Sequence, residues 1–493
     1  METTTKTQGT SGWDRYFHMT ERGSNLGTEV RGGIVTFVTM SYIVVLNPLI
    51  VGTAKDVNGN YPGGGQDIGT SIALVAAATA LIAGIMTIFM GVYGRFPIAI
   101  AAGLGLNGFL AFGLAPYMTW AQAFGLVVIE GFIVLLLVLT GFRTAVFHAV
   151  PDELKYSIGA GIGLFIALIG LVDAGVVRPG VPLITFAVFG ELAGWPIFTF
   201  VFGLLLMVVL VALRKRAAIL IGLIVTTVLA VVLEATQKIG SANTDPGAPG
   251  LENPTGWNLN VPAVPETLIG YVDPTPLFDI DIFGAFSAPA FGALAAGLAV
   301  FSLLLSDFFD TIGTVTGLAK EADLMTEDGE VDHLGEILAV DSIAAMAGGL
   351  AGTSSNTAYI ESASGIGDGA RTGIASLVTG TLFLLAMFIA PLTKIVPYEA
   401  AAPALVIVGF LMMTQIRHIP FDDYAIAIPS FLTIILMPFT YSITNGIGAG
   451  MVSYVAIKIA QGKSKEVSGL MWIIAAAFVI YFAINPLKGL FGA

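Results

Sequence analysis

Apolar stretches of about twenty residues recur from residue 31 almost to the C-terminal end, and each is long enough to cross a bilayer as a helix. The pattern predicts spans at 31–51, 69–91, 97–115, 118–140, 153–173, 194–213 and 217–235, and after a polar break at 290–317, 336–352, 354–369, 372–393, 399–415, 424–441 and 443–460. A last apolar stretch, 468–486, is expected either to span the membrane or to lie in its interface.

The longest polar break, residues 236–285, divides the fourteen predicted spans into two sets of seven. Because seven is odd, the second set would enter the membrane in the opposite orientation, as in transporters built from inverted repeats. The third span of each set begins with small or polar residues and turns helical later, near Asn107 and near Glu361. We therefore predict an all-α polytopic membrane protein with two interrupted spans, which point to a binding site near the middle of the bilayer.

The amino-acid composition excludes several other classes of protein. Hydrophobic residues make up 56% of the 493 residues and charged residues only 11%, whereas charged residues form about a quarter of a soluble protein. The same figures exclude a disordered chain. There is no cysteine, so no disulfide or thiolate metal site can form. The net charge of −13 argues against a nucleic-acid partner.

The positions of the basic residues predict how the chain is oriented in the membrane. Most of the Lys and Arg outside the spans fall on the side that carries the N-terminus, including Arg22, Arg31, the run 214–216, Lys320 and Arg371. The positive-inside rule then makes residues 1–30 a cytoplasmic tail. This tail has no apolar segment typical of a secretory signal. We expect a multi-pass protein of the plasma membrane with a cytoplasmic N-terminus.

Acids inside the predicted spans are candidate functional residues, because an ionisable group is costly to bury in a membrane. Asp307 and Asp310 lie three residues apart, so both are expected on one face of the eighth span. Glu361 lies where the tenth span turns helical. We favour substrate contact for Asp310 and Glu361, and either a structural or a coupling role for Asp307. For Glu130 and Asp341 we favour hydrogen bonds to neighbouring helices.

The central parts of the spans carry no Lys or Arg, which bears on the solute. A carboxylate-lined cavity suits a solute with several N–H donors, such as a purine, better than it suits an anion. A divalent metal is disfavoured because the spans supply no histidine partner. A proton is favoured over sodium as the coupling ion, since a buried carboxyl can load and release a proton. No cofactor is expected, and the polar loops show no motif that favours an enzyme.

Taken together, the motifs resemble those of the nucleobase–cation symporters, also called xanthine/uracil permeases, and most closely the adenine/guanine/hypoxanthine permease branch. The similarity runs from residue 21 to about residue 460. It is carried by Gly103-Leu104-Gly105-Leu106-Asn107, by Asp307-Phe308-Phe309-Asp310-Thr311-Ile312-Gly313-Thr314 and by the run from Gly352 to Ser362, together with further glycine and proline motifs in the same order.

The resemblance implies a division into domains. A core domain would comprise residues 31–140 (spans one to four) and 286–397 (spans eight to eleven). A gate domain would comprise residues 141–235 and 398–461. Residues 236–285 would form an extracellular loop and 462–493 a C-terminal apolar segment. Spans three and ten would each join a short strand to a half-helix.

The resemblance also implies a function. It assigns substrate contact to Asp310, Glu361, Asn107 and Thr357, and a supporting or coupling role to Asp307. We expect import of hypoxanthine, guanine and adenine by proton symport, with an elevator-like movement of the core against the gate. A homodimer through the gate domain is compatible with this scheme. Two alternatives stay open: a different solute, such as xanthine, uracil or an anion, and a passive nucleobase facilitator.

Overall fold

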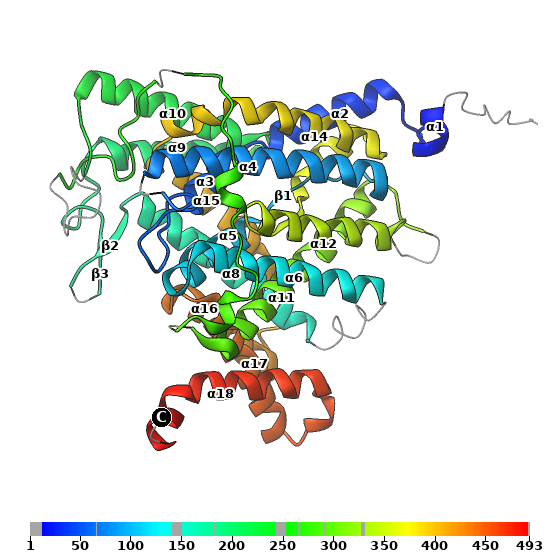
Figure 1. Cartoon of the computed structure of the whole chain (residues 1–493), viewed down its shortest axis with the longest axis vertical. Helices are drawn as coiled ribbons and strands as arrows, with labels where there is room; N and C mark the ends of the chain where they lie inside the picture. The colour runs from blue at the N-terminus through cyan, green and yellow to red at the C-terminus, as the bar shows by residue number, and fades with distance from the viewer. Residues whose placement is uncertain are drawn as a thin grey trace, which may run out of the picture.

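The computed structural model describes residues 12–65, 67–140, 150–181, 183–242, 253–264, 267–289, 291–326 and 331–491. Residues 1–11 of the predicted tail, 243–252 and 265–266 of the predicted loop, and 492–493 of the C-terminal segment lie outside this part. Within the described residues the fold is mostly helical, and most of the long helices run side by side (Figure 1). The helices labelled η are π-helices in η1 and η2 and 3₁₀-helices elsewhere.

The first half of the chain forms fifteen described elements. They are α1 (Gly12–Phe17), α2 (Leu26–Met40), α3 (Ile43–Ile50), α4 (Ile68–Phe89), η1 (Met90–Gly94), β1 (Ile100–Ala102), α5 (Leu104–Gly108), η2 (Phe109–Leu114), η3 (Ala115–Tyr117), α6 (Trp120–Leu139), α8 (Asp152–Asp173), β2 (Val177–Pro179), β3 (Ile184–Phe186), α9 (Trp195–Ala212) and α10 (Ala218–Gln237).

The second half follows a long connection that passes across α4 in Figure 1. Its elements are η4 (Thr275–Phe278), η5 (Gly284–Ser287), α11 (Gly292–Glu321), α12 (Leu334–Leu350), β4 (Asn356–Ala358), η6 (Ile360–Ser362), α13 (Ala363–Ile366), α14 (Gly373–Ala386), η7 (Met387–Ile395), α15 (Tyr398–Met413), η8 (Thr414–His418), α16 (Tyr424–Phe439), α17 (Ile443–Ala460), η9 (Ser464–Glu466) and α18 (Gly469–Phe491).

Ten helical segments among the described residues are long and apolar enough to cross a bilayer. They are α2 with α3, α4 with η1, α6, α8, α9, α10, α11, α14 with η7, α15 with η8, and α17. In the described part of the chain, the other predicted spans do not form a helix that is long enough to cross a bilayer. Helices α12 and α16 have 17 and 16 residues, and the predicted spans 97–115 and 354–369 each consist of a short strand followed by short helices.

Local sequence signals explain where several of these helices begin. Thr119 and Gln122 form a reciprocal capping box at the start of α6. The side chain of Asp67 accepts a hydrogen bond from the Thr70 amide at the start of α4, and Asp423 caps α16 in the same manner. Polar caps satisfy the first amide groups of each helix, which would otherwise lack partners at a membrane boundary.

The two interrupted segments meet in a small antiparallel sheet. Strand β1 pairs with β4, with Ile100 opposite Ala358. Side chains satisfy further backbone groups in and next to β1: the Thr87 hydroxyl accepts from Ile100 N and donates to Ile100 O, and Ser362 Oγ accepts from Ala99 N at 3.0 Å. Irregular backbone persists inside a membrane protein only where such partners satisfy it. The sheet therefore anchors both interrupted segments at one place.

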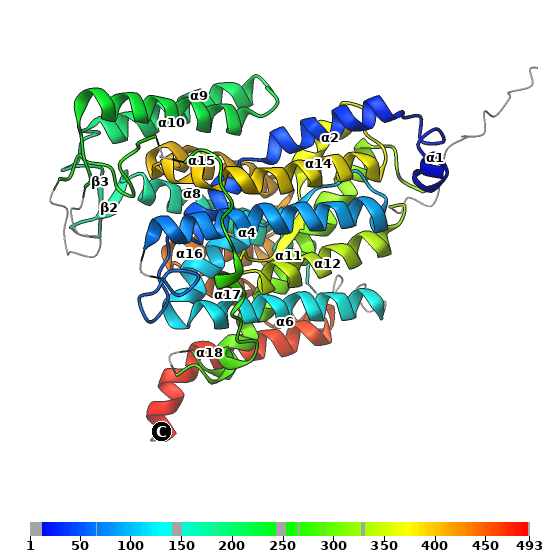
Figure 2. The same cartoon turned by 45° about the horizontal axis from the view of Figure 1, so that its top comes forward.

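Helix packing falls mainly into two groups. One group contains α2, α3, α4, α6, α11, α12 and α14, and the other contains α8, α9, α10, α15, α16 and α17. Helices α9 and α10 lie together at one edge of the molecule (Figure 2). Glycines allow close backbone contact within each group, since a Cβ on Gly373 would lie 2.0 Å from Gly91 O and one on Gly409 would lie 2.4 Å from Gly163 O.

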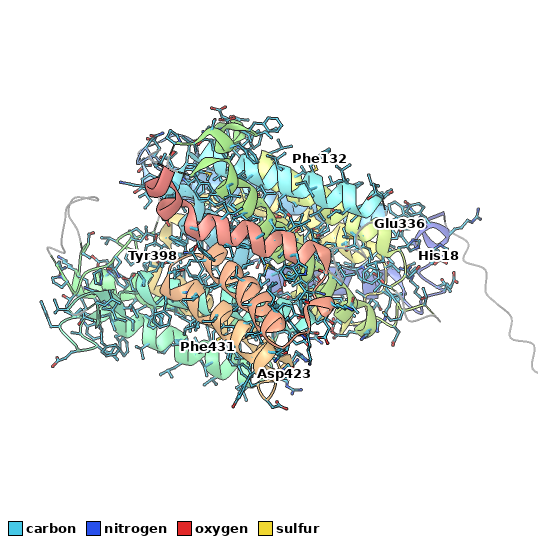
Figure 3. All side chains as sticks on the ribbon, turned by 90° about the horizontal axis from the view of Figure 1, so that it is seen from below. His18, Phe132, Glu336, Tyr398, Asp423 and Phe431 are labelled. Atoms are coloured by element: carbon cyan, nitrogen blue, oxygen red, sulfur yellow. The ribbon has the colours of Figure 1, made fainter. Side chains whose placement is uncertain are left out.

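The C-terminal helix α18 packs along α17 and also touches α11. Its axis follows those of the neighbouring helices (Figure 1), and Phe478 is completely buried on its inner side. The apolar part Gly469–Ala483 is shorter than the ten segments that are long enough to cross a bilayer, and both predicted placements stay predictions. Figure 3 shows His18 and Glu336 toward one end of the helices and Tyr398 toward the other. We call the end that carries α1 and Glu336 the α1 face.

Candidate functional site

A cavity of about 860 Å³ lies between the two helix groups. Helices α5, α11 and η6 contribute to one wall, and α8, α15 and η8 to the other. Its volume is within the range of ordinary ligand pockets. Five ionisable residues line the end nearest the α1 face: Asp152, Lys155, Lys320, Arg417 and His418. Asp310 lies ten residues before Lys320 on α11, so the cavity wall extends about 15 Å along that helix between these two residues and continues to Leu305.

Asp310 and Glu361 both line the deep part of this cavity. Asp310 belongs to the middle of α11, yet its side chain is exposed, so the cavity gives solvent access to the interior of the helix bundle. Glu361 is half-buried at the start of the segment that follows β4. The Tyr42 hydroxyl, at the start of α3, donates a hydrogen bond to Glu361 Oε1. The structure therefore brings the two predicted substrate-contacting acids into one cavity.

The other three predicted site residues do not line the cavity. Asn107 is completely buried, and its side-chain amide meets no hydrogen-bond partner within the described residues. Thr357 is buried in β4, and its hydroxyl bonds to the Thr311 hydroxyl at 2.6 Å. Asp307 is completely buried beside α6. Three residues fall about 60° short of a full helical turn, so Asp307 and Asp310 point to neighbouring parts of one side of α11, and only Asp310 lines the cavity.

A buried polar network lies behind the sheet. Thr311 donates to Asp341 Oδ2 at 2.7 Å, and the Ala358 amide donates to Asp341 Oδ1 at 2.9 Å. Asp341 therefore links α11, α12 and β4 through hydrogen bonds. Ser355 Oγ donates to Glu130 Oε2 at 3.3 Å, which ties α6 to the segment before β4. These contacts hold the backbone that leads to Glu361.

The basic residues that line the cavity lie at its mouth and not at its deep end. Lys155 pairs with Asp152 at 2.6 Å near the α1 face. The Arg371 guanidinium donates to the backbone oxygens of Ile366 and Ala370, at the end of α13. Nor does any group of three or more His, Cys, Asp or Glu side chains suited to a metal ion occur in the part of the chain that the structure describes. The deep cavity is therefore acidic and lined otherwise by neutral groups.

Sequence reasoning missed two residues of the site. Tyr42 carried no signal, because its partner Glu361 lies 319 positions away. Lys155 lies near the start of a predicted span, three residues after Asp152, and this spacing on a helix is a local signal that could have predicted their ion pair. The position of the pair at the cavity depends on the packing of α8 against other helices.

The fold is similar to that of two solved transporters. The transmembrane domain of a cyanobacterium bicarbonate transporter, BicA, matches with a TM-score of 0.54 at 15% identity, covering 86% of this chain and 97% of that one. The murine anion transporter Slc26a9, in the inward-facing state, matches with a TM-score of 0.55 at 12% identity, covering 94% of this chain and 74% of that one. At these identities the likeness concerns the fold alone.

Sequence relatives are more specific. A putative permease of Methanocaldococcus jannaschii is 37% identical over 95% of this chain and 98% of its own length. The guanine/hypoxanthine permease PbuG of Bacillus subtilis is 35% identical over 95% and 98%, and the adenine permease AdeP of Escherichia coli is 33% identical over 97% of both chains. Such relatives are transporters and not enzymes. The model of the Permease family that includes xanthine and uracil permeases matches residues 27–449. The chain therefore belongs to the xanthine/uracil permease family, and its relatives include adenine and guanine/hypoxanthine permeases.

Proposed function

We propose that this protein is a secondary active transporter that imports purine nucleobases across the plasma membrane by proton symport. The observation that carries the proposal is the pair of acids, Asp310 and Glu361, that line one solvent-accessible cavity between two groups of helices. Relatives that are named as adenine and guanine/hypoxanthine permeases support the solute class.

The chemistry of the cavity suits a purine. A nucleobase presents ring N–H and amino donors along its edge, and a carboxylate accepts such donors in strong charge-assisted hydrogen bonds. Tyr42 holds one oxygen of Glu361, and the carboxylate lines the cavity, where it can accept from the base. The apolar side chains of Leu106, Ile162 and Val408 line the same cavity and would pack against the faces of a planar ring.

The transport cycle requires the two helix groups to move relative to each other. We propose fourteen spans arranged as two inverted repeats of seven, with the group that contains α11 as the core and the group that contains α8 as the gate. With a cytoplasmic N-terminus, the α1 face is the cytoplasmic face, and the cavity opens inward. A base favours one state only as far as it binds the two states differently. An elevator-like movement of the core would carry Asp310 and Glu361 past the gate.

Uptake measurements test the proposal. Cells without their own purine permeases, expressing this protein, should accumulate labelled hypoxanthine, guanine or adenine. Asp310→Asn and Glu361→Gln should each abolish uptake, whereas Asp422→Asn, an exposed acid outside the cavity, should leave it unchanged. A protonophore should collapse accumulation, and removal of sodium should not. Absence of uptake for all three bases, or wild-type uptake by both cavity variants, would refute the proposal.

Two other functions are distinguished in the same assay. Competition by unlabelled xanthine or uracil would assign a different base. Inhibition by a small inorganic anion would point to the basic residues of the cavity mouth, Lys155, Lys320 and Arg417. A passive facilitator would equilibrate the base without concentrating it. A homodimer through the gate group is part of the proposal, and the mass of the purified protein in detergent tests it.

A further inference from the structure

Two acids face each other in the solvent-free interior of the core group. The carboxyl groups of Glu130, on α6, and Asp307, on α11, lie within hydrogen-bonding reach of each other. Both side chains are completely buried. Ser355 donates to one oxygen of Glu130. Within the described residues, the other oxygen of Glu130 and both oxygens of Asp307 receive no hydrogen bond from an amide, hydroxyl or guanidinium donor.

The charged groups that act on this pair are also acids. Asp341 faces it from α12, and Asp310 lies one turn further along α11. Basic residues on helices that pack against α11 are engaged elsewhere: Lys155 of α8 pairs with Asp152, and Lys458 of α17 pairs with Glu466. Lys320 lies at the far end of α11, at the mouth of the cavity. No cation on the neighbouring helices therefore compensates two ionised carboxylates in the described part of this region.

A shared proton resolves this arrangement. Two carboxylates in contact repel each other, and in a buried site with one hydroxyl donor and no cation they cannot both stay ionised. When one proton is present, the protonated carboxyl donates to its partner, and the proton belongs to the pair and not to either residue. The contact is then a hydrogen bond between one oxygen of Glu130 and one oxygen of Asp307, so that only one of the three oxygens without donors is left without a partner. A carboxyl pair of this kind binds and releases one proton as a unit.

We propose that Glu130 and Asp307 together hold the coupling proton, so that Glu130 is a proton-binding residue of the transporter. This inference rests on the proposed proton symport. It departs from the interpretation of Glu130 as a side chain that only hydrogen-bonds to a neighbouring helix. It also places the coupling proton on a pair of residues that does not touch the substrate.

The pair has a physical connection to the substrate site. Asp307 and Asp310 share one helix, so a movement of α11 at one acid is transmitted to the other. Ser355 connects Glu130 to the segment that forms β4 and leads to Glu361. When the pair loses its proton, the two carboxylates repel each other, and α6 and α11 separate at this level. Proton binding thus favours one arrangement of the broken segment on which Glu361 lies.

Reconstituted protein tests the assignment. Wild type, Glu130→Gln, Glu130→Asp and the control Glu191→Gln, an exposed acid on the gate side, are placed in liposomes that contain a pH-sensitive dye. In Glu130→Gln, exchange of labelled base at equal pH should stay within about threefold of wild type. Concentrative uptake driven by a pH gradient, and the proton influx that accompanies it, should fall to the level of empty liposomes. Glu130→Asp should restore part of both, and Glu191→Gln should match wild type.

Several outcomes would overturn the assignment. Proton influx and concentrative uptake at wild-type levels in Glu130→Gln would do so while leaving the proposed function intact. So would concentrative uptake in wild type that depends on sodium and carries no protons. A second measurement does not depend on transport. Infrared spectra of purified protein should show a protonated carboxyl that titrates in wild type and is missing from both Glu130→Gln and Asp307→Asn. Persistence of that signal in either variant that remains folded would overturn the pair even if no base were transported.

Discussion

Removal of the Tyr42 hydroxyl should weaken base binding by about ten- to a hundredfold. Tyr42 is buried, with 1% of its surface exposed, and its hydroxyl donates to Glu361 Oε1. A hydrogen bond to a charged group contributes about 1.5–3 kcal/mol. Without it, Glu361 can rotate within the cavity, and this energy must be supplied when the base fixes the carboxylate again. Each 1.4 kcal/mol corresponds to about a tenfold change in affinity.

Tyr42→Phe isolates this effect because the aromatic ring, and therefore the packing of α3, is retained. The dissociation constant of labelled base is measured on purified protein by equilibrium binding, together with the thermal unfolding temperature. Tyr93→Phe is the matched control, since Tyr93 is 48% exposed and does not line the cavity. An affinity of Tyr42→Phe within about twofold of wild type would refute the idea that Tyr42 positions Glu361 for binding.

Three further perturbations probe other parts of the molecule. A Cβ on Gly409 would lie 2.4 Å from Gly163 O, so Gly409→Val should lower the unfolding temperature, because overpacking costs about 1–3 kcal/mol. The control is Gly297→Ala, because nothing lies within 4 Å of a Cβ at Gly297. Equal unfolding temperatures of the two variants would contradict the packing argument. Arg216, which bonds to Asp368, and Arg31 lower the pKa of that carboxyl. The interaction is therefore present above the ordinary value of 3.8 and is lost only as the pH falls through the lowered pKa. Asp368→Asn should reduce thermal stability slightly and equally at about pH 6 and about pH 8, and unequal losses would argue against this ion pair as the cause. An epitope tag fused after α18 should be accessible on intact cells while an N-terminal tag is not; both tags on the same side would mean that α18 does not cross the membrane.

Much of the helical framework could be predicted from hydropathy. The expected span 153–173 is α8 (Asp152–Asp173), and 443–460 is α17 (Ile443–Ala460). Apolar length is a local property that every stretch of membrane-spanning sequence must satisfy by itself. The two interrupted segments were visible for the same reason, because glycine and polar residues break an apolar run. The number of spans could not be read from hydropathy in the same way, because α12 and α16 are short helices and two of the segments are interrupted.

Some features of the site could likewise be predicted from the sequence, and others depended on the packing of distant helices. Sequence alone determined that acids without basic partners occupy the spans, and the order of motifs determined the family. Only the tertiary structure decided which acid faces the cavity and which faces another helix. Asp310 lines the cavity, whereas Asp307, one turn away, is buried beside Glu130. It also decided that Tyr42 reaches Glu361. The physical reason is that a residue's cost in a membrane is set by its own chemistry, while the direction of its side chain and its partners are set by helices distant in the chain that pack against it.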